Sequence, residues 1–462
     1  MKKIFAILLS FWMAACNASS TSNSALQYPS ATLEITQAPA TDMFPSPSLT
    51  PSVTLTPSFT PPSATLAPAK MAATLIIPTL QTGSSVKLLS IQMIDAQTGW
   101  GIQQEASQIL RPGFRGDPYL SRSEGYILRT LDGGKSWQNI TPPTGAYSSG
   151  GLFAHDANRA WASENVPCCT NLTATRIWHT SDGGRSWQPS LPFFIAETGG
   201  EFFLPARMQF IDQNTGWLLA SIEAGMGYSL REALFRTVDG GDTWERVNSF
   251  LEDLGVCGNG GLAFIDSKTG WYGKSCLGDG KTSLPFNTHF AGGGFNVRLT
   301  TDGGNSFSLK TTMPIPSELQ ELAATGPEMN CGERRVIAFT PEVVGFEWEC
   351  ELFWQPDQHY RYFSLSTDAG RNWNTWEPAG SEYFFNATHG WRLLAPGQLQ
   401  QTTDSGLNWV TLKTVAWEGV QLDFVSEQEG WAVVSTGSEN ALVHTTDGGE
   451  TWEEIKPVIV PQ

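Results

Sequence analysis

A short pattern built on an aspartate recurs seven times along the 462-residue chain and constrains its fold more than any other feature. The first copy runs from Arg129 to Trp137, and every copy has Ser or Thr two residues before the Asp and Trp or Phe five residues after it. The spacings of 50, 57, 63, 66, 36 and 43 residues suit the four-stranded blades of an all-β, seven-bladed β-propeller. The repeated residues are Asp132, Asp182, Asp239, Asp302, Asp368, Asp404 and Asp447.

The chemistry of this pattern is that of a tight turn between two strands. A carboxylate followed by Gly-Gly accepts hydrogen bonds from nearby backbone amides, and glycine supplies the positive φ that a tight turn requires. The Ser or Thr lies in the entering strand and the Trp in the leaving strand. We therefore predict that the seven carboxylates stabilise turns, here called Asp turns, and are not chemical reagents.

A second pattern precedes most Asp turns and ends in a small residue, usually Gly, followed by Trp. It reads as a turn, here called the Gly-Trp turn, that leads into a strand, so each repeat is predicted to be one four-stranded meander. The fifth repeat offers Gly345-Phe346-Glu347-Trp348 instead, which predicts a distorted blade or a specialised loop. The copies are Asp95–Trp100, Asp156–Trp161, Asp212–Trp217, Asp266–Trp271, Asn386–Trp391 and Glu427–Trp431.

The two patterns account for most of the tryptophans. Together they hold twelve of the 18 Trp residues, with Phe307 in place of Trp in the fourth Asp pattern. Large aromatic side chains at repeated positions are usually buried between packed elements. We predict that these indoles pack between blades and do not form a binding platform.

Taken together, the patterns resemble the Asp-box, or BNR, repeat of bacterial sialidases, sortilin-type receptors, xyloglucanases and photosystem II stability and assembly factors. The pairing of both patterns is similar to the photosystem II assembly factor family and covers about residues 86–457. The resemblance implies a seven-bladed propeller in which each Asp pattern marks the turn between the outer strands of a blade. It also implies a role in photosystem assembly.

Residues 1–16 read as a lipoprotein signal peptide. Lys2 and Lys3 precede an apolar run that ends at Met13 and is too short to span a bilayer permanently. The order Met13-Ala14-Ala15-Cys16 resembles the bacterial lipobox, in which the signal is removed before a cysteine that carries lipid. We predict lipidation at Cys16; the alternative is an ordinary signal peptide with an incidental cysteine.

Residues 17–85 form a predicted disordered linker. They contain ten prolines and abundant Ser and Thr, but only three charged residues. Such a composition forms no packed core, and as a random coil it would span on the order of 45 Å. We therefore predict three parts: signal peptide 1–16, linker 17–85 and propeller 86–462, the last anchored by lipid on the outer side of the cytoplasmic membrane.

The remaining six cysteines suggest disulfides, because they are even in number and the chain is exported. Cys257 and Cys276 flank one predicted hairpin, and Cys331 and Cys350 flank another, so cross-strand pairing is expected in each. The adjacent Cys168 and Cys169 are expected either to form a strained vicinal disulfide or to stay as thiols. No Cys-x-x-Cys or paired His spacing supports a metal site.

The charge balance limits the partners of the chain. It has 28 basic and 45 acidic residues, for a net charge of −17. Such a charge repels phosphate backbones and anionic head groups, so we predict no nucleic-acid partner. The expected partners are the membrane, through the lipid anchor, and a protein or glycan ligand, and we expect a monomer.

No catalytic motif stands out. The chain lacks a Gly-rich phosphate loop, a Gly-x-Ser-x-Gly elbow, a His-Glu-x-x-His motif and the early Arg-Ile-Pro motif of sialidases. His179 and His444 occupy one repeat position and are interpreted as repeat filler. A xyloglucanase-like site needs two acids across a cleft. Candidate acids outside the Asp turns are Asp253, Asp279, Glu347 and Asp357.

The favoured function is a non-catalytic lipoprotein propeller that acts as a scaffold for protein or glycan binding or for assembly, without a cofactor. The alternative is a sialidase- or xyloglucanase-like glycoside hydrolase, and the photosystem role is the third reading. The longest inserts between repeats are residues 221–233, 273–297 and 319–362. We predict that these inserts are loops, which either form the binding surface or are tolerated surface insertions.

Overall fold

The computed structural model describes residues 80–104, 125–143, 152–168, 172–193, 203–223, 230–249, 256–277, 294–313, 316–319, 321, 329–352, 355–377, 382–394, 397–436 and 439–462. Contacts divide the chain into units of residues 1–70 and 71–462, and all described residues belong to the second unit. The predicted signal peptide, Cys16 and nearly all of the linker lie outside these ranges. No helix within them is long and apolar enough to cross a membrane.

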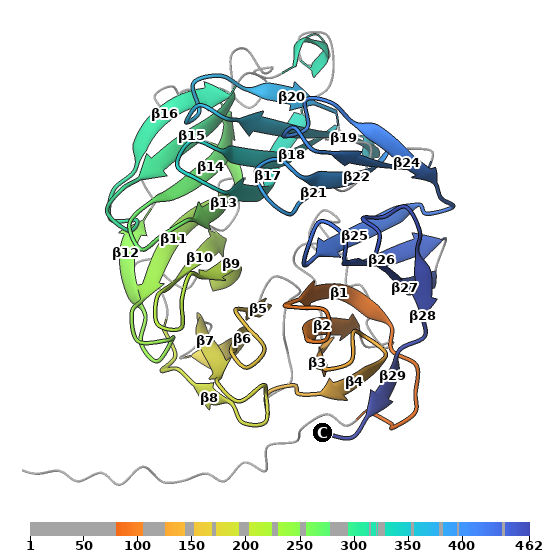
Figure 1. Cartoon of the computed structure of the whole chain (residues 1–462). Coiled ribbons are helices and arrows are strands. Elements are labelled where there is room, and N and C mark those ends of the chain that lie inside the picture. The colour runs from red at the N-terminus through yellow and green to blue at the C-terminus, as the bar shows by residue number, and fades with distance from the viewer. Residues whose placement is uncertain are drawn as a thin grey trace, which may run out of the picture. The chain divides into compact units, whose positions relative to one another are not determined.

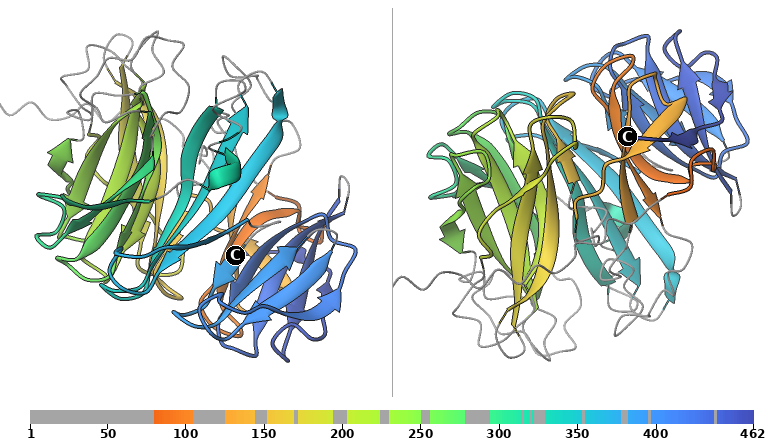
Figure 2. Two further views of the ribbon diagram at one scale, coloured as in Figure 1. Left: turned by 90° about the horizontal axis from the view of Figure 1, so that it is seen from above. Right: turned by 90° about the horizontal axis from the view of Figure 1, so that it is seen from below.

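Seven antiparallel sheets form a ring, which confirms the predicted all-β, seven-bladed propeller (Figure 1). Within each sheet the strands follow one another in chain order, and the first strands of several neighbouring blades contact each other around the centre. Figure 2 shows the same ring from above and from below the view of Figure 1, with neighbouring sheets packed face to face. Blades are numbered 1 to 7 in chain order.

Each of the first four blades contains four strands in chain order. Blade 1 contains β1 (Leu88–Met93), β2 (Gly99–Gln104), β3 (Gly125–Thr130) and β4 (Ser136–Asn139). Blade 2 contains β5 (Leu152–Ala154), β6 (Ala160–Cys168), β7 (Leu172–Thr180) and β8 (Gln188–Pro189). Blade 3 contains β9 (Phe203–Phe210), β10 (Gly216–Glu223), β11 (Leu230–Thr237) and β12 (Glu245–Ser249). Blade 4 contains β13 (Val256–Phe264), β14 (Gly270–Leu277), β15 (Gly294–Thr300) and β16 (Ser308–Met313).

The remaining blades repeat this order. Blade 5 contains β17 (Met329–Ala338), β18 (Val344–Leu352), β19 (Gln355–Ser366) and β20 (Asn374–Trp376). Blade 6 contains β21 (Glu382–Phe384), β22 (Gly390–Leu394), β23 (Gln398–Thr402) and β24 (Val410–Thr414). Blade 7 contains β25 (Gly419–Phe424), β26 (Gly430–Thr436), β27 (Glu439–Thr445) and β28 (Glu453–Ile455), and β29 (Val458–Val460) follows it.

Strand β29 closes the ring by joining blade 1. It pairs in parallel with β4, beside which Figure 1 places the C-terminus. Its other edge hydrogen-bonds to residues 83–86, where the Gly83 amide donates to the Ile459 carbonyl at 2.8 Å. The Ile459 side chain is buried in the core between blades 7 and 1. Hydrogen bonding to the ring therefore begins a few residues before the predicted boundary at Val86.

All seven Asp turns share one hydrogen-bond pattern. In each, one carboxylate oxygen accepts from the hydroxyl two residues before the Asp and from the amide four residues after it, the latter at 2.8–3.0 Å. The other oxygen accepts from the Ser, Thr or Asn side chain four residues after it at 2.5–2.7 Å. Each carboxylate thus joins the two strands that its turn connects.

The backbone of these turns shows why glycine recurs in them. Five turns have Gly at positive φ at both positions after the Asp, for example Gly133 at 73° and Gly134 at 93°. In blades 5 and 6 the first position is Ala369 at 60° and Ser405 at 64°, conformations that side chains with a Cβ adopt at a cost. The Ser405 hydroxyl offsets part of that cost by donating to the Ala387 carbonyl at 2.7 Å.

The two turns of every blade are tied together at one end of the sheet. The amide of the residue after each repeated Asp donates to a carbonyl of the Gly-Trp turn in the same blade, at 2.8–3.0 Å. The Gly-Trp turn is itself stabilised by a side chain that accepts from two following amides, as Asp212 does from Asn214 and Thr215. In each blade, hydrogen bonds therefore hold the Asp turn and the Gly-Trp turn together at the same end of the sheet.

Gly-Trp indoles connect neighbouring blades. The Trp161, Trp217 and Trp391 rings stack at 3.6 Å on a Phe of the next blade's first strand. The same three indole nitrogens donate to an Asp-turn carbonyl of the next blade at 2.6–2.9 Å, and Trp431 does so across the closure to Gly133. The predicted packing between blades is present, and it includes a directional hydrogen bond that sequence reasoning did not foresee.

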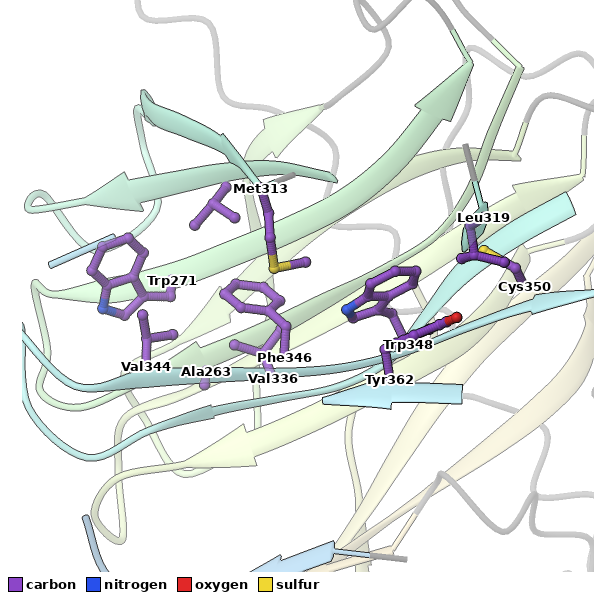
Figure 3. Packing of buried hydrophobic residues seen from close by; sticks show 11 residues of the cluster. Ala263, Trp271, Met313, Leu319, Val336, Val344, Phe346, Trp348, Cys350 and Tyr362 are labelled. Atoms are coloured by element: carbon purple, nitrogen blue, oxygen red, sulfur yellow. The ribbon is translucent and has the colours of Figure 1, made fainter. Parts of the chain in front are cut away.

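Blade 5 has four strands as the other blades do, with register shifts between Glu333 and Arg335 and between Glu351 and Leu352. Phe346 stands in the position of the Gly-Trp indole and is fully buried, and Trp348 stacks on Tyr362 with ring centroids 4.6 Å apart. These side chains fill the core between blades 4 and 5 together with Trp271 and Met313 (Figure 3). Aromatic residues two positions apart on β18 thus replace the missing tryptophan.

The described parts of the long inserts extend hairpins, whereas loops are predicted over the whole of residues 221–233, 273–297 and 319–362. In blade 3, antiparallel pairing of β10 with β11 continues without interruption from the pair Gly216–Thr237 to the pair Glu223–Leu230. Strands β14, β15 and β17–β19 extend through the other two inserts in the same way. The loop prediction is wrong for these residues because cross-strand pairing continues past the repeat core. The rest of each insert lies outside the described ranges.

The indole hydrogen bonds predict unequal effects of one substitution at two equivalent positions. Trp431→Phe removes the bond to the Gly133 carbonyl and leaves that buried acceptor unpaired, which costs about 1–3 kcal/mol beyond the lost packing. Trp271→Phe removes a buried indole nitrogen that has no hydrogen-bond partner among the described residues. Thermal unfolding should show the larger loss for Trp431→Phe. Equal losses would mean that packing alone connects the blades.

Candidate functional site

The repeated aspartates are poor candidates for acid–base chemistry. Burial raises the pKa of Asp302, but hydrogen bonds from Ser306 and Thr300 outweigh it and bring the pKa below its ordinary value. Hydrogen bonds from Asn372 to Asp368 and from Thr451 to Asp447 lower the pKa of each carboxyl to about 2. A carboxylate that stays ionised and has both oxygens occupied does not donate a proton near neutral pH.

A cavity of about 300 Å³ lies among the first strands of blades 2 to 5. Its charged residues are Arg207 of β9 and Arg335 of β17, and Gln209 is its other polar side chain. No Asp or Glu is among the described residues that line it. The walls are otherwise apolar and consist of Phe153, Met208, Leu262, Ala263, Val336, Ile337 and Ala338.

The repeat explains why this cavity exists where it does. Arg207, Gly261 and Arg335 each lie three residues before the end of the first strand of blades 3, 4 and 5. Each pairs with the second strand of its blade at the same register, Gly261 opposite Gly273. Blade 4 thus has no side chain at the repeat position where its two neighbours carry arginines.

The two arginines differ in their surroundings. Among the described residues, Arg207 makes no ion pair or hydrogen bond through its guanidinium. Arg335 reaches towards blade 6, where one of its Nη atoms donates to the Glu382 carbonyl. Its Nε lies 3.4 Å from a Glu347 carboxylate oxygen. Arg335 therefore connects the cavity with a polar cluster between blades 5 and 6.

Glu382 is the unusual member of that cluster. Its side chain is 1% exposed, and neither carboxylate oxygen has a hydrogen-bond partner among the described residues. Burial first, and then the nearby charge of Glu347, raises its pKa to about 8, although Arg392 and Arg335 act in the opposite direction. Glu382 is therefore mostly protonated at neutral pH.

A second buried acid lies between blades 6, 7 and 1. Asp423 of β25 accepts a hydrogen bond from the Met93 amide of β1, and burial raises its pKa to about 7. Tyr383 of β21 donates to the Phe424 carbonyl at 3.0 Å. Asp423 thus stabilises the junction where blade 7 meets blade 1.

Sequence reasoning missed these residues, although the repeat contained a signal. Glu382 occupies the position two residues before the end of the first strand, where the other six blades have apolar side chains. An ionisable residue in an otherwise apolar repeat position is visible once the blades are aligned on that strand. The residues at this position are Ile91, Leu152, Met208, Leu262, Val336, Glu382 and Leu422.

The structure leaves several predicted site residues without a described side chain. Cys257 lies opposite Cys276, and Cys331 opposite Cys350, in the strand registers. Cys350 is disulfide-bonded, and its pairing with Cys331 remains a prediction. The other predicted positions without a described side chain are Cys168, Cys169, Asp253, Asp279 and Asp357.

The histidines at the shared repeat position lie near acids, and one of them also stacks on a Gly-Trp indole. His444 stacks on Trp431 with ring centroids 4.5 Å apart, and its Nε2 lies 3.2 Å from a Glu429 oxygen. His179 Nε2 lies 3.5 Å from an Asp242 oxygen of the next blade. Within the described part of the chain, no group of three His, Cys, Asp or Glu residues could hold a metal ion.

Comparisons with known proteins concern the fold alone. No family model matches the chain. No curated protein matches it either. Among solved structures, it is similar to YCF48 bound to D1 peptide, at 16% identity and a TM-score of 0.42 over 79% of this chain and 95% of that chain. It is also similar to a PL25 ulvan lyase, at 10% identity and a TM-score of 0.46 over 82% of this chain and 96% of that chain. A third similar structure is a GH74 enzyme from Niastella koreensis, with 13% identity and a TM-score of 0.29. The match covers 80% of this chain and 64% of that chain.

The raised pKa of Glu382 predicts that stability falls as the pH rises. The folded chain binds this proton more tightly than the unfolded chain, so the contribution is complete below the ordinary pKa of 4.5 and is lost as the pH rises through about 8. The slope is at most about 1.4 kcal/mol per pH unit for one group. Thermal unfolding of Glu382→Gln should show a flatter profile and a higher melting temperature than the wild type at about pH 9.

The exposed Glu450 provides the matched control, because Glu450→Gln removes the same charge from the surface. It should follow the wild-type profile. A Glu382→Gln profile parallel to the wild type would show that Glu382 does not titrate in this range.

Proposed function

We propose that the chain is a lipid-anchored, extracytoplasmic propeller that binds its ligand without catalysis, and that the cavity of the inner strands is its ligand site. The composition of the cavity wall carries this proposal. Two arginines and one glutamine line it without any carboxylate, whereas hydrolysis of glycosidic bonds usually requires two carboxyl groups. Small-ligand sites are typically concave, mostly apolar and supplied with a few polar groups, as this cavity is.

The scaffold around the cavity supports the same function. The seven Asp turns and the indole hydrogen bonds fix the blades relative to their neighbours. A site built on such strands keeps its geometry before the ligand arrives, which reduces the entropy lost on binding. The linker and the lipobox-like sequence around Cys16 support display of the ring at a membrane surface.

A glycoside hydrolase is the second candidate, because Glu382 and Asp423 have raised pKa values and such shifts are frequent among catalytic acids. Their positions favour a structural role. Glu382 is influenced by Glu347 and Arg335 of blade 5, whereas Asp423 bonds to Met93 of blade 1. The two side chains are only 1% and 8% exposed, so a polysaccharide chain does not reach them in this conformation.

Lipid anchoring is tested by metabolic labelling. The full chain, expressed in a bacterial host with labelled palmitate, should carry label and sediment with membranes, because acyl chains bury methylenes in the bilayer. Cys16→Ser should abolish the label, and Cys168→Ser should keep it. Label that persists in Cys16→Ser, or is absent from the wild type, would contradict the anchor.

Ligand binding at the cavity is tested with the purified full chain and cell-envelope extract. The wild type should retain envelope components that Arg207→Glu loses by at least tenfold, because the substitution reverses a cavity charge. Arg371→Glu, at an exposed Asp-turn position, is the matched control and should bind as the wild type does. Equal retention by all three chains would place binding elsewhere. Hydrolysis of a glycan panel by the wild type, lost in Glu382→Gln, would favour the enzyme.

A further inference from the structure

Polar side chains on the first strands connect neighbouring blades through main-chain groups. The Gln209 side chain of β9 donates to the Phe264 carbonyl of β13 and accepts from the Phe264 amide, both at 2.8 Å. Gln92 of β1 bonds to both main-chain groups of Ala154 in β5 in the same way, at 2.7 and 3.2 Å. In each case a primary carboxamide occupies the inner edge of the next blade, where that sheet has no further strand.

The position that supplies these side chains is the residue before the last one of each first strand. Tyr383 and Asp423 occupy it in blades 6 and 7, and each bonds to one main-chain group of the next blade. In blades 2, 4 and 5 the residue is apolar, and all three apolar residues line the cavity. The residues at this position are Gln92, Phe153, Gln209, Ala263, Ile337, Tyr383 and Asp423.

The main chain of Ala338 is the inner edge of blade 5 that corresponds to Phe264 in blade 4. Ala338 ends β17 opposite Val344, and the next amide, that of Phe339, donates to the Val343 carbonyl at 3.0 Å. Hydrogen-bonded and non-bonded pairs alternate along an antiparallel ladder, so Ala338 belongs to a non-bonded pair. Its amide and carbonyl therefore point away from β18, and no hydrogen bond from another described residue reaches them.

The cavity lies at this free edge, because Ala338 and Ala263 are both among its lining residues. At the other two apolar positions, the ring of Phe153 and the branched side chain of Ile337 pack in the cores between their blades. Ala263 has only a methyl group with which to cover the main chain of the next blade. The cavity therefore offers one donor and one acceptor on a single residue, beside apolar walls.

Building on the proposed function, we propose that the cavity binds a primary carboxamide on a short aliphatic stem, which accepts from the Ala338 amide and donates to the Ala338 carbonyl. Gln209 of this chain makes the same pair of bonds on the neighbouring blade. The stem gains from burial against Leu262 and Val336, and an ionised carboxylate lacks the donor that the carbonyl requires. A free amide and the glutamine side chain of a peptide both provide this chemistry, and the arms of the experiment separate them.

Ligand-observed NMR titration of the purified full chain in detergent compares amides with analogues that lack the N–H donor. Butyramide is paired with 2-pentanone, and N-acetyl-glutamine methylamide with N-acetyl-methionine methylamide, so each control has nearly the same length as its amide. At least one amide should bind ten times or more tightly than its control. The amide that binds more tightly identifies the source.

Two variants locate the binding. Ala263→Gln gives blade 4 the side chain that blade 3 has at this position, so its own carboxamide should displace the probe and raise the melting temperature by about 2 °C. Ala338→Pro removes the amide donor on an edge strand, without a bond in the ladder, and should weaken amide binding at least tenfold. Arg371→Gln, at an exposed position, should leave binding unchanged and corrects for uptake by the detergent.

Amides that bind no more tightly than their controls, or amide binding that survives either variant in folded form, would overturn the proposal. If a variant fails to fold, the probe pairs on the wild type still decide it. If no amide binds while envelope retention depends on Arg207, the ligand class is wrong and the proposed function stands. If no amide binds and retention is independent of Arg207, the proposed site fails as well.

Discussion

The hydrogen-bonded aspartate turn is the constraint on which the ring depends. Each repeated carboxylate joins the two outer strands of its blade, and the backbone that it holds presents a carbonyl to the preceding blade. In four of the seven junctions a Gly-Trp indole donates to that carbonyl, including the closure from Trp431 to Gly133. The turn thus organises its own sheet and also the interface with its neighbour, so local and long-range order arise from one motif.

Departures from the repeat gather in blades 4 to 6. The Trp271 indole nitrogen lacks a partner among the described residues, and Phe346 replaces the next Gly-Trp indole. Blades 5 and 6 have Ala369 and Ser405 at positive φ. Glu382 is buried close to the cavity arginine Arg335. Natural sequences tend to break local rules where function requires it, so blades 4 to 6 are the part of the ring to test for function.

The cavity and the buried acids illustrate how one polar network serves two purposes. Arg335 faces the cavity and also holds the Glu382 carbonyl, so it links a candidate ligand site with the interface of blades 5 and 6. Burial disfavours the charged form of both acids and raises the pKa of Glu382 to about 8 and that of Asp423 to about 7, so Glu382 is mostly protonated at neutral pH. A single side chain, that of Arg335, therefore belongs both to a cavity-lining residue and to the interface of blades 5 and 6.

The sequence by itself determined the number of blades, the order of their strands and the positions of both turns, because these depend on local patterns that recur at a readable period. The sequence also contains the ionisable Glu382 at a repeat position where the other six blades have apolar residues. This departure becomes visible only when the blades are aligned on the ends of their first strands. Tertiary structure alone decided that Arg207 and Arg335, 128 residues apart, line one cavity and that Trp431 bonds to Gly133. It also decided that the described parts of the predicted insert loops pair as extended hairpin strands. The physical reason is that a blade's neighbours are set by closure of the ring, which no local pattern in the chain specifies.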